Sequence, residues 1–139
     1  MNLSDMKVVS AAKAGAEMPL LSPFNGEPTG AFLIVEGFDS PAMIKAARDY
    51  DREAASNPAS KDTDEALRLR RAHLGASALK GWRNFEWDGK ALEFTPEKAM
   101  EICMDPEYQW ITEQVVRFGG SRRNFTPKPK GAASSGQAT

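Results

Sequence analysis

Residues suited to covalent or metal chemistry are scarce in this chain. Cys103 is its only cysteine and His73 its only histidine, so four Cys or His ligands for a structural zinc ion cannot be assembled. His73 has no obvious nucleophile near it in sequence, and Cys103 lies among Met100, Ile102 and Met104, which favours a buried, unreactive thiol. We therefore predict no catalytic residue, no metal and no cofactor, and we expect a protein that is not an enzyme.

Sequence motifs of common enzymes do not change this prediction. The chain has no G-x-S-x-G nucleophile motif, and its glycines at 26, 30 and 37 lack the spacing of a phosphate or dinucleotide loop. The acidic residues Asp62, Asp64 and Glu65 fit the first turn of a helix, where they complement its dipole. The chain is expected to work by binding.

The balance of charge excludes some partners. With 18 basic and 19 acidic residues, the net charge of −1 gives no overall attraction to nucleic acid or anionic lipid. No apolar run approaches the ~20 residues of a membrane span. Lys13 interrupts the small-residue run "SAAKAGA", so we expect no secretory signal and a location in the cytoplasm.

The first structural elements are strands. We expect residues 1–17 to be flexible. Ala31–Val35 reads as a strand between Gly30 and Gly37, and Met18–Leu21 can pair with it as an antiparallel edge strand that tolerates Pro19. An unpaired edge at Ala31–Val35 would favour self-association.

Two charged, alanine-rich helices are predicted next. Ser40 and Pro41 form an N-cap and first helical position, and Met43, Ala47, Tyr50 and Ala54 make one apolar stripe before "SNPAS" ends the helix. The second helix is expected from Thr63 or Asp64 to Lys80, with Gly81 as its C-terminal glycine. Leu67 and Leu74 lie on its apolar face. These helices form an αα-hairpin.

The remaining pattern predicts a short β-hairpin and two short helices. Asp88-Gly89 is a hairpin turn between Phe85 and Phe94. Thr95-Pro96 and Asp105-Pro106 each start a helix, and the second is expected to end at Gly119. The fold class is thus mainly α with a small β element (α+β), with a single domain over residues 18–120 and a disordered basic tail over 121–139.

Aromatic residues concentrate in the segment "GWRNFEWDGKALEFTPE", which spans 81–97. Only 25 of the 139 residues are Val, Ile, Leu or Phe, which is below the ~20% level at which disorder becomes a concern, and so few residues can fill only a small core. The large rings are therefore expected mainly in the core, although one or two can face a partner. The aromatic set comprises Trp82, Phe85, Trp87, Phe94 and Trp110.

Three segments together resemble the small tail assembly chaperones of long-tailed bacteriophages and prophages. They are "GEPTGAFLIVEGFDSPAMIKAARDYDRE", "LKGWRNFEWDGKALEFTPEKAMEICMDPEYQWITEQV" and "RRNF". In such chaperones a Gly-Trp precedes a short hairpin, a "tpE" helix start follows, and an aromatic-Ile pair comes after a proline. The matching positions are Gly81, Trp82, Asp88, Gly89, Phe94, Thr95, Pro96, Glu97, Trp110 and Ile111.

The resemblance implies a role in assembly. Such chaperones bind the long helical tape measure protein, keep it soluble, help recruit tail tube subunits and are absent from the finished virion. The helices Ser40–Ala55 and Asp64–Lys80 can present a shallow groove to such a helix. The candidate partner-binding residues are Met43, Tyr50, Leu67, Leu74, Arg122, Arg123 and Phe125.

Two other functions fit the sequence. A small structural virion protein, such as a tail or connector protein, would be found in purified particles. A small nucleic-acid-binding regulator would use the basic stretch "SRRNFTPKPK", in which Phe125 can stack on a base. Nucleic acid is the less favoured partner, because the domain before this stretch is acidic.

Overall fold

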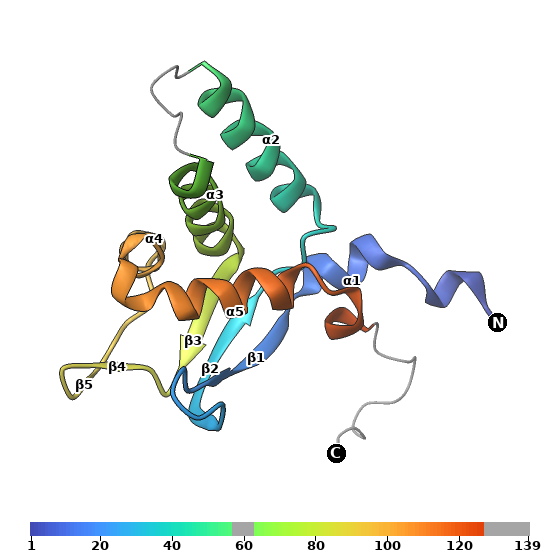
Figure 1. Ribbon diagram of the computed structural model, residues 1–139. Helices are drawn as coiled ribbons and strands as arrows, with labels where there is room; N and C mark the ends of the chain where they lie inside the picture. The colour runs from blue at the N-terminus through green and yellow to red at the C-terminus, as the bar shows by residue number, and fades with distance from the viewer. Residues whose placement is uncertain (57–62, 127–139) are drawn as a thin grey trace.

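The computed structural model describes residues 1–56 and 63–126 and has the predicted α+β fold (Figure 1). Its main sheet comprises β1 (Ala16–Leu21), β2 (Pro28–Val35) and β3 (Leu79–Arg83), and a small hairpin comprises β4 (Glu86–Trp87) and β5 (Lys90–Ala91). The α-helices are α1 (Val8–Ala14), α2 (Pro41–Ala55), α3 (Thr63–Ala78), α4 (Pro96–Met104) and α5 (Gln109–Gly119). Short 3-10 turns are η1 (Leu3–Asp5), η2 (Pro106–Tyr108) and η3 (Arg122–Phe125).

The three long strands form an antiparallel sheet in the order β1-β2-β3. Leu33 of β2 pairs with Met18 on one side and with Trp82 on the other. The predicted β1–β2 pair is confirmed, and Pro19 lies on an edge strand, where its missing N–H is tolerated. Because β2 is the central strand, Ala31–Val35 pairs within the chain on both sides and offers no unpaired edge.

The end of the second predicted helix is also wrong. The sequence indicated a helix to Lys80 with Gly81 as its cap, whereas α3 ends at Ala78 and the chain continues directly as β3. Gly81 pairs with Ile34, and Leu79 is buried. Pairing with β2 therefore overrides the local helical pattern.

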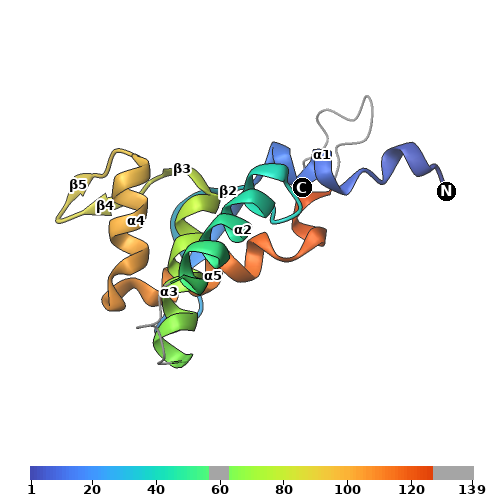
Figure 2. The same ribbon diagram turned by 90° about the horizontal axis from the view of Figure 1, so that it is seen from above.

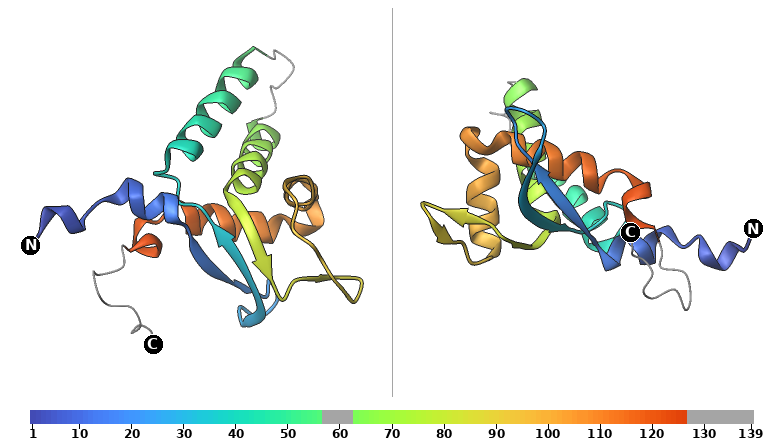
Figure 3. Two further views of the ribbon diagram at one scale, coloured as in Figure 1. Left: turned by 180° about the vertical axis from the view of Figure 1, so that it is seen from behind. Right: turned by 90° about the horizontal axis from the view of Figure 1, so that it is seen from below.

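One face of the sheet carries the core. Leu20, Leu33 and Val35 are almost fully buried, and their inward positions alternate along the strands with exposed or half-buried residues. Helix α5 crosses this face and contributes Ile111 and Val115 to the same core (Figure 1). Figure 3 shows the opposite face of the sheet, which no described helix crosses.

The cap-plus-proline motifs act as predicted. The Ser40 hydroxyl accepts a hydrogen bond from the Met43 N–H at 3.1 Å, and the Thr95 hydroxyl accepts one from the Lys98 N–H at 3.0 Å. Asp105 likewise caps a helical turn, but that turn is η2, and α5 begins only at Gln109. The Asp88-Gly89 hairpin turn is confirmed, with φ of 53° and 79°.

Both ends of the folded region extend further than predicted. Residues 1–17 were expected to be flexible, yet α1 lies within this range and Ala12 is 2% exposed. Residues 121–126 were assigned to the disordered tail, whereas η3 inserts Phe125 into the core. The sequence pattern missed both ends because each is held by long-range contacts. The rest of the predicted tail, 127–139, lies outside the described residues.

Gly37 is the point at which these two ends meet the sheet. Its N–H donates to the Ala12 carbonyl at 2.9 Å, and a Cβ added there would lie 2.7 Å from the Ala12 Cβ and 3.2 Å from the Phe125 ring. We predict that Gly37→Ala lowers the free energy of unfolding by about 1–3 kcal/mol, as overpacking does. Urea denaturation measures this loss. Gly81→Ala is the control, because its Cβ meets only an ordinary contact at 3.4 Å; equal stability of the two variants would contradict the prediction.

Candidate partner-binding site

A groove opens between α2 and α3, the two helices of the predicted αα-hairpin. Helix α2 leans away from the body of the molecule, and α3 lies closer to α4 and α5 (Figure 1). The groove has a volume of about 420 Å³. Its lining residues are Phe38, Met43, Ile44, Ala47, Leu67, Arg70, Arg71, Leu74 and Val116.

The groove has a buried floor and exposed apolar rims. Met43 and Leu74 lie in the floor and are 3% and 7% exposed. Ile44 on α2 and Leu67 on α3 are each 46% exposed, so both leave apolar surface in contact with water. An apolar groove between two helices suits a third helix that packs its own apolar stripe against them.

Polar contacts connect the two helices along the groove. The Tyr50 and His73 rings are 4.8 Å apart, and the Arg70 guanidinium donates two hydrogen bonds to the Asp51 carboxylate at 2.8 and 3.0 Å. This bidentate contact lowers the pKa of Asp51. The pair joins α2 to α3, but it is exposed and adds little stability.

Arg71 gives the groove a positive charge. Arg70 and Arg71 are its only ionisable lining residues within the described chain; Arg70 is paired with Asp51, and Arg71 is exposed. A partner with carboxylates beside its apolar stripe would complement this charge.

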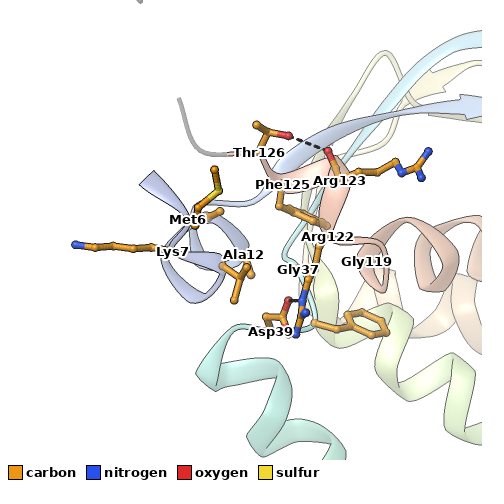
Figure 4. Close-up of a pocket in the computed structure, with 13 residues that line it drawn as sticks. Met6, Lys7, Ala12, Gly37, Asp39, Gly119, Arg122, Arg123, Phe125 and Thr126 are labelled. Carbon is orange, nitrogen blue, oxygen red and sulfur yellow. Dashed lines mark hydrogen bonds and ion pairs between the residues drawn. The ribbon is translucent and has the colours of Figure 1, made fainter. Parts of the chain in front are cut away.

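The predicted basic residues lie in a separate cleft between α1 and η3 (Figure 4). The cleft has a volume of about 230 Å³ and is lined by Arg122, Arg123 and Phe125 together with residues of α1. The Arg122 guanidinium donates to the Asp39 carboxylate at 2.7 and 3.1 Å. Phe125 is 5% exposed, and its ring centroid is 5.5 Å from that of Phe118. Phe125 thus serves the core.

The Asp39–Arg122 ion pair predicts a pH dependence of stability. Hydrogen bonding to Arg122 lowers the pKa of Asp39 in the folded protein. The stability that ionised Asp39 contributes is therefore complete above its pKa in the unfolded chain, about 4. It is lost as the pH falls through the lower pKa of the folded protein. Asp39→Asn should slightly reduce the thermal midpoint at pH 7 and leave it like that of the parent near pH 2. A deficit of equal size at both pH values would contradict this reading.

The aromatic residues form two adjoining clusters that share Phe85. The Trp82 indole N–H donates to the Leu92 carbonyl at 2.7 Å, and its ring lies 4.9 Å from Phe85 and 4.7 Å from Phe94. Trp82 is therefore structural. The aromatic bowl, defined as Phe85, Trp87, Tyr108 and Trp110, instead lines an open cavity of about 630 Å³.

The structure brings together only part of the predicted site. Met43, Leu67 and Leu74 share the groove, and Tyr50 lies beside it in a smaller depression with His73. Arg122, Arg123 and Phe125 do not reach it. The sequence reasoning missed Phe38, Ile44 and Val116. Ile44 had a local signal, since it lies three residues before Ala47, whereas Phe38 and Val116 are placed only by the tertiary fold.

The comparison with protein families assigns the chain. A family model described as YdaY prophage protein matches residues 39–134, which is more than half of the chain. The chain belongs to the YdaY prophage protein family. The matched region of this prophage protein starts just before α2 and includes both groove helices. No curated protein and no solved structure matched it.

Other features of this prophage protein bear on chemistry. Cys103 is 2% exposed, so its predicted burial is confirmed. Burial raises the pKa of its thiol, which disfavours the reactive thiolate. Among residues 1–56 and 63–126, no group of three or more His, Cys, Asp or Glu side chains is placed to hold a metal ion. No helix in the described part of the chain is long and apolar enough to cross a membrane.

Proposed function

We propose that this prophage protein is a tail assembly chaperone without catalytic activity. It binds the tape measure protein in the host cytoplasm, keeps it soluble and helps to recruit tail tube subunits. It then leaves before the virion is complete. Membership of a prophage protein family supports a phage-related function, and the resemblance to tail assembly chaperones supports this particular role.

The observation that carries the proposal is the groove between α2 and α3. A long amphipathic helix aggregates through its apolar stripe unless a partner covers that stripe. Ile44 and Leu67 offer exposed apolar side chains on the two sides of one groove. Helix-in-groove docking uses such an arrangement, with apolar anchors at helical spacing.

The groove also suits temporary binding. Its exposed apolar rims consist of single side chains, Ile44 on one side and Leu67 on the other. Met43 in the floor is unbranched and can adjust to different side chains of the partner. A chaperone that must release its client gains from such a limited and adaptable contact.

Co-expression with the phage tape measure protein tests the proposal. The tagged chain should retain the tape measure protein through purification and increase its soluble fraction. Failure of both effects would contradict the proposal. Mass spectrometry of purified particles separates the chaperone from a structural virion protein, because the chaperone should be absent from particles.

A further inference from the structure

The aromatic bowl is a second site, apart from the groove. Its four rings come from the β4–β5 region and from the η2–α5 junction, and all four are half-buried. Trp87 and Tyr108 meet edge to face, with ring centroids 5.7 Å apart. The cavity floor includes the buried side chains of Leu20, Ile102 and Ile111.

The rim of the bowl is acidic. Glu86 and Asp88 line the cavity and are exposed, and neither forms an ion pair within the described residues. The Lys98 ammonium lies 5.4 Å from the centroid of the Trp87 ring, so this ring already attracts a cation. Aromatic faces with nearby carboxylates form a site that favours lysine or arginine side chains.

We propose that the bowl binds residues 127–130, Pro-Lys-Pro-Lys, of a second copy of this chain. Lys128 and Lys130 complement the charges of Glu86 and Asp88. A residue that precedes proline favours extended backbone, and proline-rich extended segments pack on aromatic rings in many recognition domains. The family match extends to residue 134 and thus includes this segment.

The geometry favours another copy. Thr126 and Gly119 line the α1–η3 cleft, whereas Trp110 lines the bowl. Gly119 and Trp110 are nine residues apart on α5, which separates them by about 13 Å at the rise of an α-helix. Lys128 follows Thr126 by two residues and reaches only about 7 Å, and Lys130 reaches about 14 Å at the upper limit for a chain, which leaves no length to cross the body of the molecule. Figures 1 and 2 show the hairpin and the C-terminal end of the described chain on opposite sides.

Such contacts link molecules head to tail. Each copy offers one bowl and one basic segment, and these surfaces differ, so the contact is heterologous and can extend beyond two copies. The association is expected to weaken with salt, because it depends on exposed charges. It leaves the α2–α3 groove free, and its test is independent of the proposed chaperone function.

Sedimentation velocity of the full chain tests this proposal with two charge variants. The bowl variant is Glu86→Gln with Asp88→Asn, which removes both rim charges. Asparagine tolerates the positive φ at position 88, so the turn should keep its shape. The tail variant is Lys128→Glu with Lys130→Glu. The parent should associate as concentration rises, and each variant alone should remain monomeric. The control Glu53→Gln with Glu113→Gln removes two exposed carboxylates outside the cavity and should associate like the parent.

Mixing the two variants gives the decisive outcome. The bowl variant retains an intact basic segment and the tail variant an intact bowl, so their equimolar mixture should form dimers and no larger species. A monomeric parent at all concentrations, association of either variant like the parent, or a monomeric mixture would each overturn the proposal.

Discussion

Trp82→Ala is expected to unfold the protein or to lower its free energy of unfolding by about 3–5 kcal/mol, as loss of a large core ring does. The substitution removes the hydrogen bond to the Leu92 carbonyl and two ring contacts, with Phe85 and Phe94. It also removes the side chain of the residue that pairs with Leu33 at the centre of the sheet. Urea denaturation followed by circular dichroism measures the effect.

Trp87→Ala is the matched control for this prediction. Trp87 is also half-buried, but its ring borders the open bowl and pairs with Tyr108 alone among the described rings. Its replacement should therefore cost less stability than that of Trp82. If Trp82→Ala stayed as stable as the parent and instead lost partner binding, Trp82 would belong to a binding platform.

The variant Ile44→Ser with Leu67→Ser is expected to weaken binding of the proposed partner, the tape measure protein, by about 10- to 100-fold. Full burial of one such side chain contributes about 1.5–3 kcal/mol, only about half of each remains to be buried, and each 1.4 kcal/mol corresponds to tenfold in affinity. Both side chains are 46% exposed in the free chain, so the fold should tolerate their loss. Titration of the tape measure fragment that co-purifies with the parent gives the affinity.

Leu21→Ser with Phe24→Ser provides the control for the groove variant. These residues are 38% and 95% exposed, and they lie outside the groove at the β1–β2 turn. The control variant should bind like the parent, and thermal midpoints should show that both variants fold. Equal loss of affinity in the two variants would indicate general apolar stickiness in place of a defined groove.

Local signals explain how much of the fold could be predicted. The Ser40, Thr95 and Asp105 caps depend on residues within three positions along the chain, and each forms its hydrogen bond in the structure. Strand β3 could not be predicted this way. Leu79 and Lys80 continue the helical pattern up to Gly81, and Leu79–Arg83 becomes a strand only because β2 is available for pairing. The packing of Phe125 is likewise a long-range effect.

Local helical periodicity also predicted part of the groove. Met43, Leu67 and Leu74 follow the helical periodicity of α2 and α3, so the sequence indicated that they share a side. Which of them remain exposed depends on how far α2 diverges from α3, which periodicity does not determine. Hence Leu67 is a rim residue, whereas Met43 and Leu74 are buried in the floor.

Hydrogen–deuterium exchange of the chain with and without bound tape measure protein tests the central proposal most directly. If the partner helix occupies the groove, protection should increase in α2 (Pro41–Ala55) and α3 (Thr63–Ala78). The open face of the sheet and the β4–β5 hairpin should be unchanged. Protection confined to those two regions, with α2 and α3 unaffected, would contradict the groove as the binding site.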